Sequence, residues 1–217
     1  NEPADFADIV NQFRLAAVHT FDPATGLYRH AWDSSHSMPW ADKETGQSPH
    51  AWGRAMGWYA MAIVDALDYI PQNQPGRDEL IKTLNTLVEG IAKIQDTKTG
   101  GWYQVADRSG DAGNYIETSC TSMFTYSILK GVRKGYLNEK YLINACAAYQ
   151  GLIKNFITTN ADGTVNLTRV CSVAGLGGNP YRNGSYEYYI GEPVRDNDPK
   201  GVAPFIMASI EYESICK

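Results

Sequence analysis

Residues 48–71 read SPHAWGRAMGWYAMAIVDALDYIP, and this stretch predicts a helix that is buried on nearly every side. Ser48 is a favourable N-cap, Pro49 suits the first helical position, and Pro71 ends the helix. Apolar residues form one stripe along it and small residues form another, so little of its surface is suited to water. The apolar stripe is Trp52, Met56, Tyr59, Ile63 and Leu67, and the second is Gly53, Gly57, Ala60 and Val64.

One charged residue, Arg54, lies in the opening turns of this helix. Helical spacing places it on one face with Trp58, Met61 and Asp65. The positive end of the helix dipole disfavours a cation there, so we expect a nearby anion to neutralise it. That anion is either a bound ligand or an acidic residue of a loop, and the sequence allows both.

The composition is that of a globular protein, and 217 residues suffice for one domain with a sizeable core. A net charge of −5 argues against nucleic acid or an anionic membrane as a partner. No apolar run is long enough to span a membrane. The four cysteines have no close spacing, so we expect neither a zinc site nor a disulfide framework. The chain opens on Asn1 without a signal-type segment, which suggests a piece of a longer protein, and the sequence favours neither cytoplasm nor periplasm.

Hydrophobic spacing predicts further helices of two alternating kinds. Amphipathic helices are expected over residues 4–21, 80–94 and 141–156, and buried ones over 115–135 and 202–215 in addition to the first. Strand-like segments at 27–33 and 164–170 follow turns, and a glycine- and tyrosine-rich loop fills 171–201. The amphipathic helices should form an outer layer and the buried ones an inner layer. Long connections run from outer to inner, so the long loops should gather where the inner helices begin.

An internal repeat accompanies this order. The turn Asp22–Gly26 recurs as Asp96–Gly100, and Gly163 repeats it more loosely. We therefore predict an all-α fold, an α/α toroid, in which three helix pairs make about half of a six-pair ring. An open helical solenoid is the alternative, and the buried inner layer favours the closed ring. Half a ring should leave an apolar flank uncovered on helices 4–21 and 202–215.

Four segments resemble glycoside hydrolase family 105, the unsaturated rhamnogalacturonyl hydrolases, and more distantly family 88. They are TGLYRHAWD, SPHAWGRAMGWYAMAIVDALDYIP, ETSCTSMFTYSILKGVRKGYL and RDNDPKGVAPFIMASIE, in the order that the family has. The resemblance implies that residues 1–217 are the C-terminal part of a single (α/α)6 domain, whose N-terminal half is the partner of this chain. It implies a bacterial enzyme of pectin degradation that needs no metal or cofactor.

The implied reaction removes a 4,5-unsaturated galacturonyl residue from the non-reducing end of pectin-derived rhamnogalacturonan oligosaccharides. It begins with hydration of the C4–C5 double bond: one carboxylic acid protonates C4 while water adds at C5, and the resulting hemiketal opens. The resemblance assigns substrate binding to His30, Arg54 and Trp58. Arg54 and its helix N-terminus would face the substrate carboxylate. The family's catalytic aspartate belongs to a segment upstream of residue 1.

Other candidates come from the residues themselves. Trp40 and Trp102 either stack on sugar rings or seal the ends of the barrel. In the absence of the upstream aspartate, Asp33 and Glu117 are the acids to consider. Asp33 also suits a loop cap, and Glu117 suits a helix N-terminus or a pairing with Arg54.

Two other functions remain open at this stage. One is a non-catalytic, carbohydrate-binding half-toroid, which the lack of an upstream carboxylate favours for this chain alone. The other is a sugar epimerase on the same barrel, which would need paired histidines as acid and base. The histidines available are His19, His30, His36 and His50.

Overall fold

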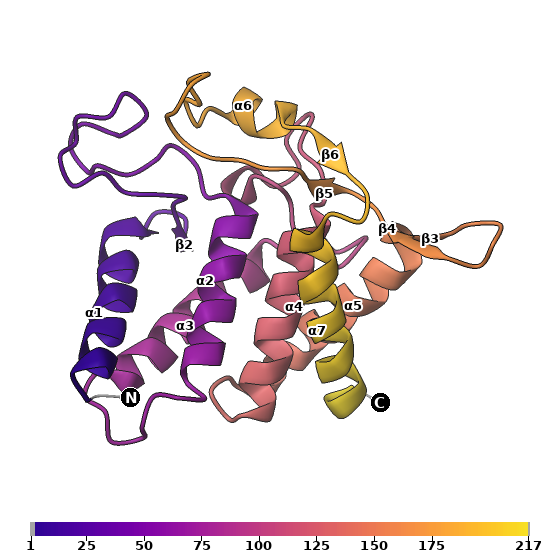
Figure 1. The fold of residues 1–217 in the computed structure, drawn as a ribbon, viewed down its shortest axis with the longest axis horizontal. Helices are drawn as coiled ribbons and strands as arrows, with labels where there is room; N and C mark the ends of the chain where they lie inside the picture. The colour runs from indigo at the N-terminus through magenta and orange to yellow at the C-terminus, as the bar shows by residue number, and fades with distance from the viewer. Residues whose placement is uncertain (1–2, 217) are drawn as a thin grey trace.

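Helices dominate the computed structural model, which describes residues 3–216 (Figure 1). They are α1 (Pro3–Thr20), α2 (Gly53–Ala66), α3 (Arg77–Lys93), α4 (Thr118–Arg133), α5 (Leu142–Phe156), α6 (Tyr186–Gly191) and α7 (Pro199–Ile215). Short antiparallel pairs join β1 (Phe21–Asp22) to β2 (Leu27–Tyr28), β3 (Ile157–Thr159) to β4 (Val165–Leu167), and β5 (Val170–Cys171) to β6 (Val194–Arg195). Single 3-10 turns occur at Ala106–Arg108 and Glu139–Tyr141. None of the described helices has the length and hydropathy that crossing a membrane requires.

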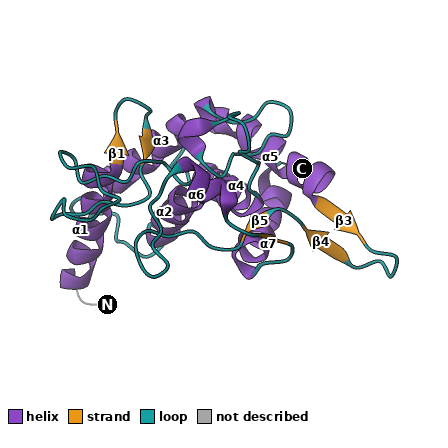
Figure 2. Ribbon diagram, turned by 90° about the horizontal axis from the view of Figure 1, so that it is seen from above, coloured by secondary structure: helices purple, strands orange, loops and turns teal. Residues whose placement is uncertain are grey.

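Helix α4 forms the centre of the molecule, and every residue from Thr118 to Val132 is buried. It packs between α2 and α7, and α5 lies against it on the outer side (Figure 2). Helix α3 packs against α1 and α2. The helices predicted to be buried therefore form one row, against which α3 and α5 pack. Of this row α7 is not buried as predicted, since only its face with Gly201, Pro204, Ala208 and Glu211 is covered.

Hydroxyl side chains explain how α4 remains stable with no face toward water. Ser122, Thr125 and Ser127 each donate to the carbonyl four residues earlier, at 2.7 to 2.8 Å. Their polar groups are thus satisfied within the helix, which leaves an outer surface suited to burial. Glycines of α2 allow the closest approach: a Cβ on Gly57 would lie 2.8 Å from the sulfur of Met123.

The predicted helix over 48–70 is shorter than expected, because α2 begins only at Gly53 and ends at Ala66. The five residues before it are drawn into contacts with other loops. The main-chain N–H of Ser48 donates to Ala31, and that of Gly53 donates to Gln104. Ser48 therefore anchors a loop, and the N-cap position belongs to Trp52. Tertiary hydrogen bonds outweigh the local capping signal here.

The expectation that the cysteines form no disulfide framework was wrong for one pair, since Cys146 and Cys216 form a disulfide between α5 and the end of α7. The two residues are 70 positions apart in sequence, and their Cα atoms lie 6.4 Å apart. Only the side-by-side packing of α5 and α7 brings them together, which spacing alone does not reveal. Cys120 and Cys171 are free thiols in the interior.

The two recurring turns have the same construction. The Asp22 carboxylate accepts from the Thr25 hydroxyl at 2.7 Å, and Asp96 accepts from Thr99 at the same distance. Each turn closes on a glycine with φ of 73°. A side chain is strained in that left-handed conformation, which explains why glycine stands at Gly26 and Gly100.

Exposed apolar side chains occur on the two end helices, where the sequence predicted them. Helix α1 presents Ile9, Leu15 and Val18, and α7 presents Ile206 and Ile210. Val18 and Ile210 are each 62% exposed, more than packing against a covered face would allow. Both flanks of the described helical layer therefore carry apolar surface that this chain does not cover.

Candidate functional site

The long loops meet at the end of the molecule where the inner helices begin, at the top of Figure 1. The N–H of His30 donates to His50, and the N–H of Ala106 donates to Ala51. Gln104 reaches α6, where its side chain donates to the Tyr189 carbonyl at 3.3 Å. Segments from all three long connections thus form one continuous surface, on which we place the candidate site.

His30 lies inside this surface, between two aromatic rings. Its Nδ1 is 2.6 Å from the Tyr189 hydroxyl, and its ring centre is 4.7 Å from that of Trp52. Burial, together with the positive charge of Arg182, lowers the pKa of His30 to about 4. The imidazole is therefore neutral near pH 7. Its Nε2 bonds to none of the residues 3–216, and the side chain borders a cavity of about 190 Å³.

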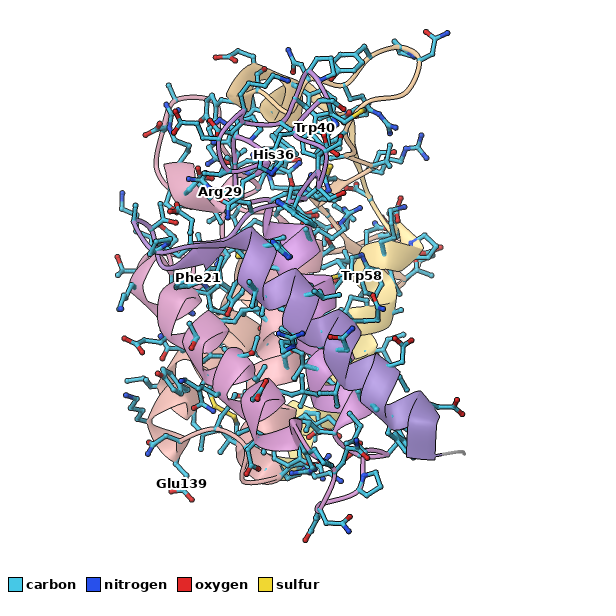
Figure 3. All side chains as sticks on the ribbon, turned by 90° about the vertical axis from the view of Figure 1, so that its left-hand side faces the viewer. Phe21, Arg29, His36, Trp40, Trp58 and Glu139 are labelled. Carbon is cyan, nitrogen blue, oxygen red and sulfur yellow. A yellow bond between two sulfur atoms is a disulfide. The ribbon has the colours of Figure 1, made fainter. Side chains whose placement is uncertain are left out.

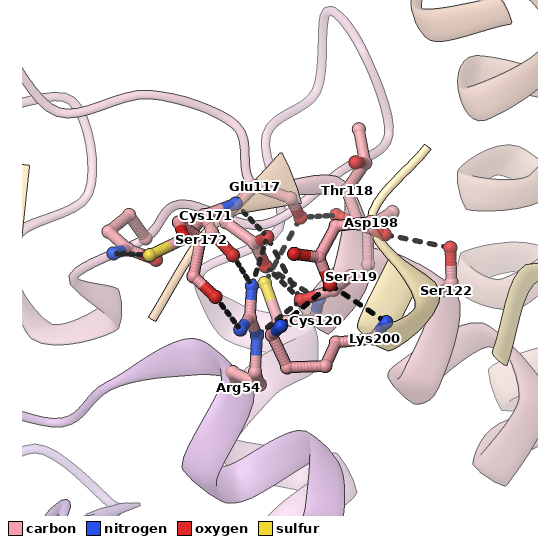
Figure 4. Close-up of polar contacts among 12 residues, drawn as sticks. Arg54, Glu117, Thr118, Ser119, Cys120, Ser122, Cys171, Ser172, Asp198 and Lys200 are labelled. Carbon is pink, nitrogen blue, oxygen red and sulfur yellow. Dashed lines mark hydrogen bonds and ion pairs between the residues drawn. The ribbon is translucent and has the colours of Figure 1, made fainter. Parts of the chain in front are cut away.

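The chain itself uses the hydrogen-bond donors of Arg54 (Figure 4). Its Nε donates to Ser119 at 2.7 Å, and Nη2 donates to Glu117 at 3.2 Å and to the Cys171 carbonyl. Nη1 is directed at the Ser172 carbonyl, 3.4 Å away. The side chain is only 2% exposed. The sequence allowed either a bound ligand or an acidic residue as the anion beside Arg54, and the structure contains an acidic residue there.

Glu117 is this partner, and its carboxylate is fully buried. It caps α4 by accepting from the N–H of Cys120 at 2.7 Å. It also accepts from the N–H of Cys171 at 2.9 Å and so ties β5 to the start of α4. A carboxylate with these partners holds the loops in place. Because it is fully buried in this chain, a substrate at the surface could not contact it.

Trp102 is buried in the core of this chain. Its side chain is 0% exposed, its Nε1 donates to the Ile91 carbonyl at 2.8 Å, and its ring meets Phe124 edge to face at 5.2 Å. This burial favours a packing role for Trp102 over the stacking on a sugar ring that the sequence also allowed. Reaching a sugar would require it to leave the core.

Trp58 and Trp40 remain candidates for contact with a sugar ring. Trp58, 47% exposed, projects from the middle of α2, below the loops that carry Arg29, His36 and Trp40 (Figure 3). Trp40 borders a surface cleft of about 530 Å³, together with Arg29 and Pro49. The exposed indole of Trp58 and the partly exposed indole of Trp40 are both suited to the apolar face of a sugar ring.

Asp33 acts as a loop cap. Its carboxylate accepts main-chain N–H groups from Ser35, Ser37 and Met38 at 2.8 to 3.1 Å. These hydrogen bonds, the one from Met38 first, lower the pKa of Asp33 to about 2. An acid that is ionised over the whole working range of most enzymes is poorly suited to donate a proton.

Some residues of the site were not foreseen from the sequence. Asp107 accepts from Arg29 at 3.1 Å and from His50 Nδ1 at 2.9 Å, and Arg29 also pairs with Asp22 at 2.7 Å. This chain of charges links the first two long loops. Tyr189 was missed because it lies on α6, a helix too short for a periodic signal. The only local sign of α6 is Ser185, whose hydroxyl accepts from the N–H of Tyr188 at 3.2 Å.

No three or more His, Cys, Asp or Glu side chains in the part of the chain that the structure describes are grouped to hold a metal ion.

The whole chain is similar to a known protein family and to several known proteins. A family described as Glycosyl Hydrolase Family 88 matches residues 1–216. The chain is 40% identical over 215 residues to the "24.9 kDa protein in picA locus" of Rhizobium radiobacter and spans 91% of that protein. It is 29% identical over 143 residues to the "Unsaturated rhamnogalacturonyl hydrolase YesR" of Bacillus subtilis and covers 38% of it.

Solved structures of glycoside hydrolases are also similar to this chain. A family 105 glycoside hydrolase of C. acetobutylicum superimposes with a TM-score of 0.96 at 49% identity, over 99% of this chain and 59% of that one. An unsaturated glucuronyl hydrolase of a Bacillus species superimposes with a TM-score of 0.62 at 12% identity, over 94% of this chain and 50% of that one, which supports the fold alone. The helix-rich fold is thus that of these α/α toroids, and the chain spans between half and three fifths of these two solved chains.

Proposed function

The chain belongs to Glycosyl Hydrolase Family 88, and on this premise we propose that it forms part of a hydrolase for unsaturated uronyl oligosaccharides. The substrate that we propose is a rhamnogalacturonan oligosaccharide with a 4,5-unsaturated galacturonyl residue at its non-reducing end. The similarity to the Bacillus subtilis relative, which is named for that activity, supports this choice. The observation that carries the proposal is the family match over residues 1–216, combined with one surface on which all three long loops meet.

We propose further that the chain supplies three of six helix pairs: α1 with α2, α3 with α4, and α5 with α7. Two findings support this. The chain covers only 59% of the C. acetobutylicum structure while matching it closely, and apolar side chains are exposed on α1 and α7. In this proposal an N-terminal half covers those flanks and completes the barrel. Burying them would stabilise the assembly in proportion to the apolar area removed from water.

The acids of this chain indicate which half of the proposed barrel supplies the proton donor. The reaction needs one carboxylic acid that keeps its proton until C4 of the substrate takes it. Asp33 is ionised by its loop, and Glu117 is buried against Arg54, so neither suits this role. We assign the acid to the N-terminal half. The present chain contributes the neutral His30, placed to exchange a hydrogen bond with a sugar hydroxyl, and Trp58 as a packing surface.

The test uses the complete barrel proposed above, this chain joined to an N-terminal half, which we call the full-length protein, and an unsaturated rhamnogalacturonan disaccharide. Hydration of the C4–C5 double bond removes its conjugation with the carboxylate, so ultraviolet absorbance falls as the reaction proceeds. We expect steady loss of absorbance and release of the neutral sugar. Absorbance that stays constant, with the disaccharide recovered intact, would reject this activity.

The same assay tests a second function, because neither Asp33 nor Glu117 is suited to the role of the acid. A carbohydrate-binding half-toroid would bind the disaccharide without consuming it. Binding without loss of absorbance by the full-length protein would select this second function.

A further inference from the structure

A substrate with a carboxylate requires a cation whose donors are free, and most cations around the loops are already engaged. Arg54 is paired with Glu117. Arg29 is divided between Asp22 and Asp107. Lys43 donates to three carbonyls of its own loop, at 3.1 to 3.3 Å.

Arg182 is different, because the loop between β5 and α6 holds its side chain and leaves the end of the side chain free. Gly177 and Arg182 exchange main-chain hydrogen bonds at 2.8 and 3.1 Å. The Nε of Arg182 also donates to the Gly177 carbonyl at 3.0 Å. Its Nη1 and Nη2 have no acceptor among residues 3–216, and no ion pair forms there with a described carboxylate. Three contacts therefore position a guanidinium whose two terminal nitrogens are unused.

Two glycines make room for this guanidinium. A Cβ on Gly175 would lie 2.5 Å from Nη1, and a Cβ on Gly178 would lie 2.9 Å from Nη2. Any side chain at either position would push the guanidinium away. The glycine-rich sequence of this loop thus has a specific structural consequence, which is to seat Arg182 against bare main chain.

The position of the loop brings Arg182 to the candidate site. A Cβ on Gly177 would lie 3.5 Å from the end of Met38 and 3.9 Å from Nε1 of Trp40, so this loop touches the loop that follows β2. Figure 1 shows the segment between β5 and α6 above α2, near that loop. The positive charge of Arg182 also contributes, after burial, to the lowered pKa of His30. The loop that carries Arg182 therefore contacts the loop that carries Trp40, and Arg182 lies near enough to His30 for its charge to act on the imidazole.

We propose that Arg182 is the residue of this chain that binds the carboxylate of the uronyl substrate, through Nη1 and Nη2. This inference rests on the proposed function, because that function supplies the anionic sugar. A guanidinium binds a carboxylate with two parallel hydrogen bonds, and a cation held in place loses little entropy when it does so. Arg182 takes the role that the sequence suggested for Arg54.

Equilibrium binding tests the proposal without turnover. The ligand is a saturated galacturonyl-rhamnose disaccharide, which lacks the double bond, and its methyl ester serves as the uncharged comparison. The proteins are the full-length wild type and its Arg182→Gln, Arg182→Lys and Arg195→Gln variants. Arg195 is the matched control, since it is an exposed arginine on β6 without an ion pair to a described residue.

We expect Arg182→Gln to weaken binding of the acid by about tenfold or more while the ester changes by less than about twofold. Arg182→Lys should fall between wild type and Arg182→Gln, because a point charge replaces a bidentate fork. Arg195→Gln should bind like wild type. Equal effects of Arg182→Gln on acid and ester, or no effect on either, would overturn the proposal.

An NMR titration of His30 gives a second readout that does not depend on any ligand. Removing the positive charge in Arg182→Gln should raise the pKa of His30, and Arg195→Gln should not. A His30 pKa that is the same in Arg182→Gln and wild type would place Arg182 away from the site and contradict the proposal. Neither experiment uses the hydrolytic reaction. If Arg182 passes both while the unsaturated disaccharide is not consumed, only the proposed function fails.

Discussion

Arg54 and Glu117 form a salt bridge in which neither side chain has appreciable contact with solvent, with Nη2 and Oε1 3.2 Å apart. It joins the start of α2 to the start of α4, and through Cys171 it also joins β5. A charge pair of this kind fixes the geometry of the loop end of the molecule. Its two members are interdependent, since a buried charge without its partner is strongly disfavoured.

Breaking this pair should therefore be costly. Glu117→Gln leaves the guanidinium of Arg54 buried without a counter-charge, and we expect a loss of about 3–5 kcal/mol in the free energy of unfolding. Urea denaturation measures it. The double variant Arg54→Met/Glu117→Gln should recover part of the loss, because no unpaired charge remains. A loss in Glu117→Gln below about 1 kcal/mol would show that the pair is not what holds these loops.

His30 should make stability depend on pH. Its folded pKa of about 4 lies below the ordinary value of 6.5, so the unfolded chain binds the proton more readily. The contribution is fully present above pH 6.5 and is lost as the pH falls from 6.5 toward 4. Between pH 7 and pH 5 we expect wild type to lose about 2 kcal/mol more than His30→Gln does. Parallel pH profiles of the two proteins in chemical denaturation would contradict this.

Two of the three tryptophans that were candidates for sugar contact, Trp102 and Trp58, should respond differently to substitution. Trp102→Ala removes a buried ring and should lower the free energy of unfolding by about 3–5 kcal/mol. Trp58→Ala, at an exposed position, should cost less than about 1 kcal/mol yet weaken binding of the disaccharide. Thermal denaturation and calorimetric titration of both variants provide the comparison. If Trp58→Ala destabilises as much as Trp102→Ala, the proposed role of Trp58 in binding is wrong.

The disulfide between Cys146 and Cys216 closes a loop of 70 residues and should contribute up to about 4 kcal/mol. Reductant should therefore lower the melting temperature of wild type. The paired Cys146→Ser/Cys216→Ser variant should melt at the lower temperature with or without reductant. A melting temperature of wild type that reductant leaves unchanged would indicate that the C-terminal helix is held by packing alone.

The helical layers could be predicted because periodic apolar spacing over more than a dozen residues is a strong local signal. The start of α2 could not, because Ser48 and Pro49 are used by tertiary contacts with other loops. α6 could not be predicted because its 6 residues are too few for a periodic signal. The disulfide could not be predicted because only the packing of α5 on α7 brings its cysteines together. At the site, the sequence identified Arg54 as needing an anion. It left open which anion, since Glu117 approaches only in three dimensions.

We propose that this chain provides the binding side of a uronyl hydrolase and that the N-terminal half provides its acid. The most direct measurement incubates the purified 217-residue chain, shown to be monomeric, with unsaturated rhamnogalacturonan disaccharide, in parallel with the full-length protein. We predict that ultraviolet absorbance falls with the full-length protein and stays constant with the chain alone. Turnover by the isolated chain at an ordinary enzymatic rate would contradict this division of roles and would make Asp33 and Glu117 the acids to test first.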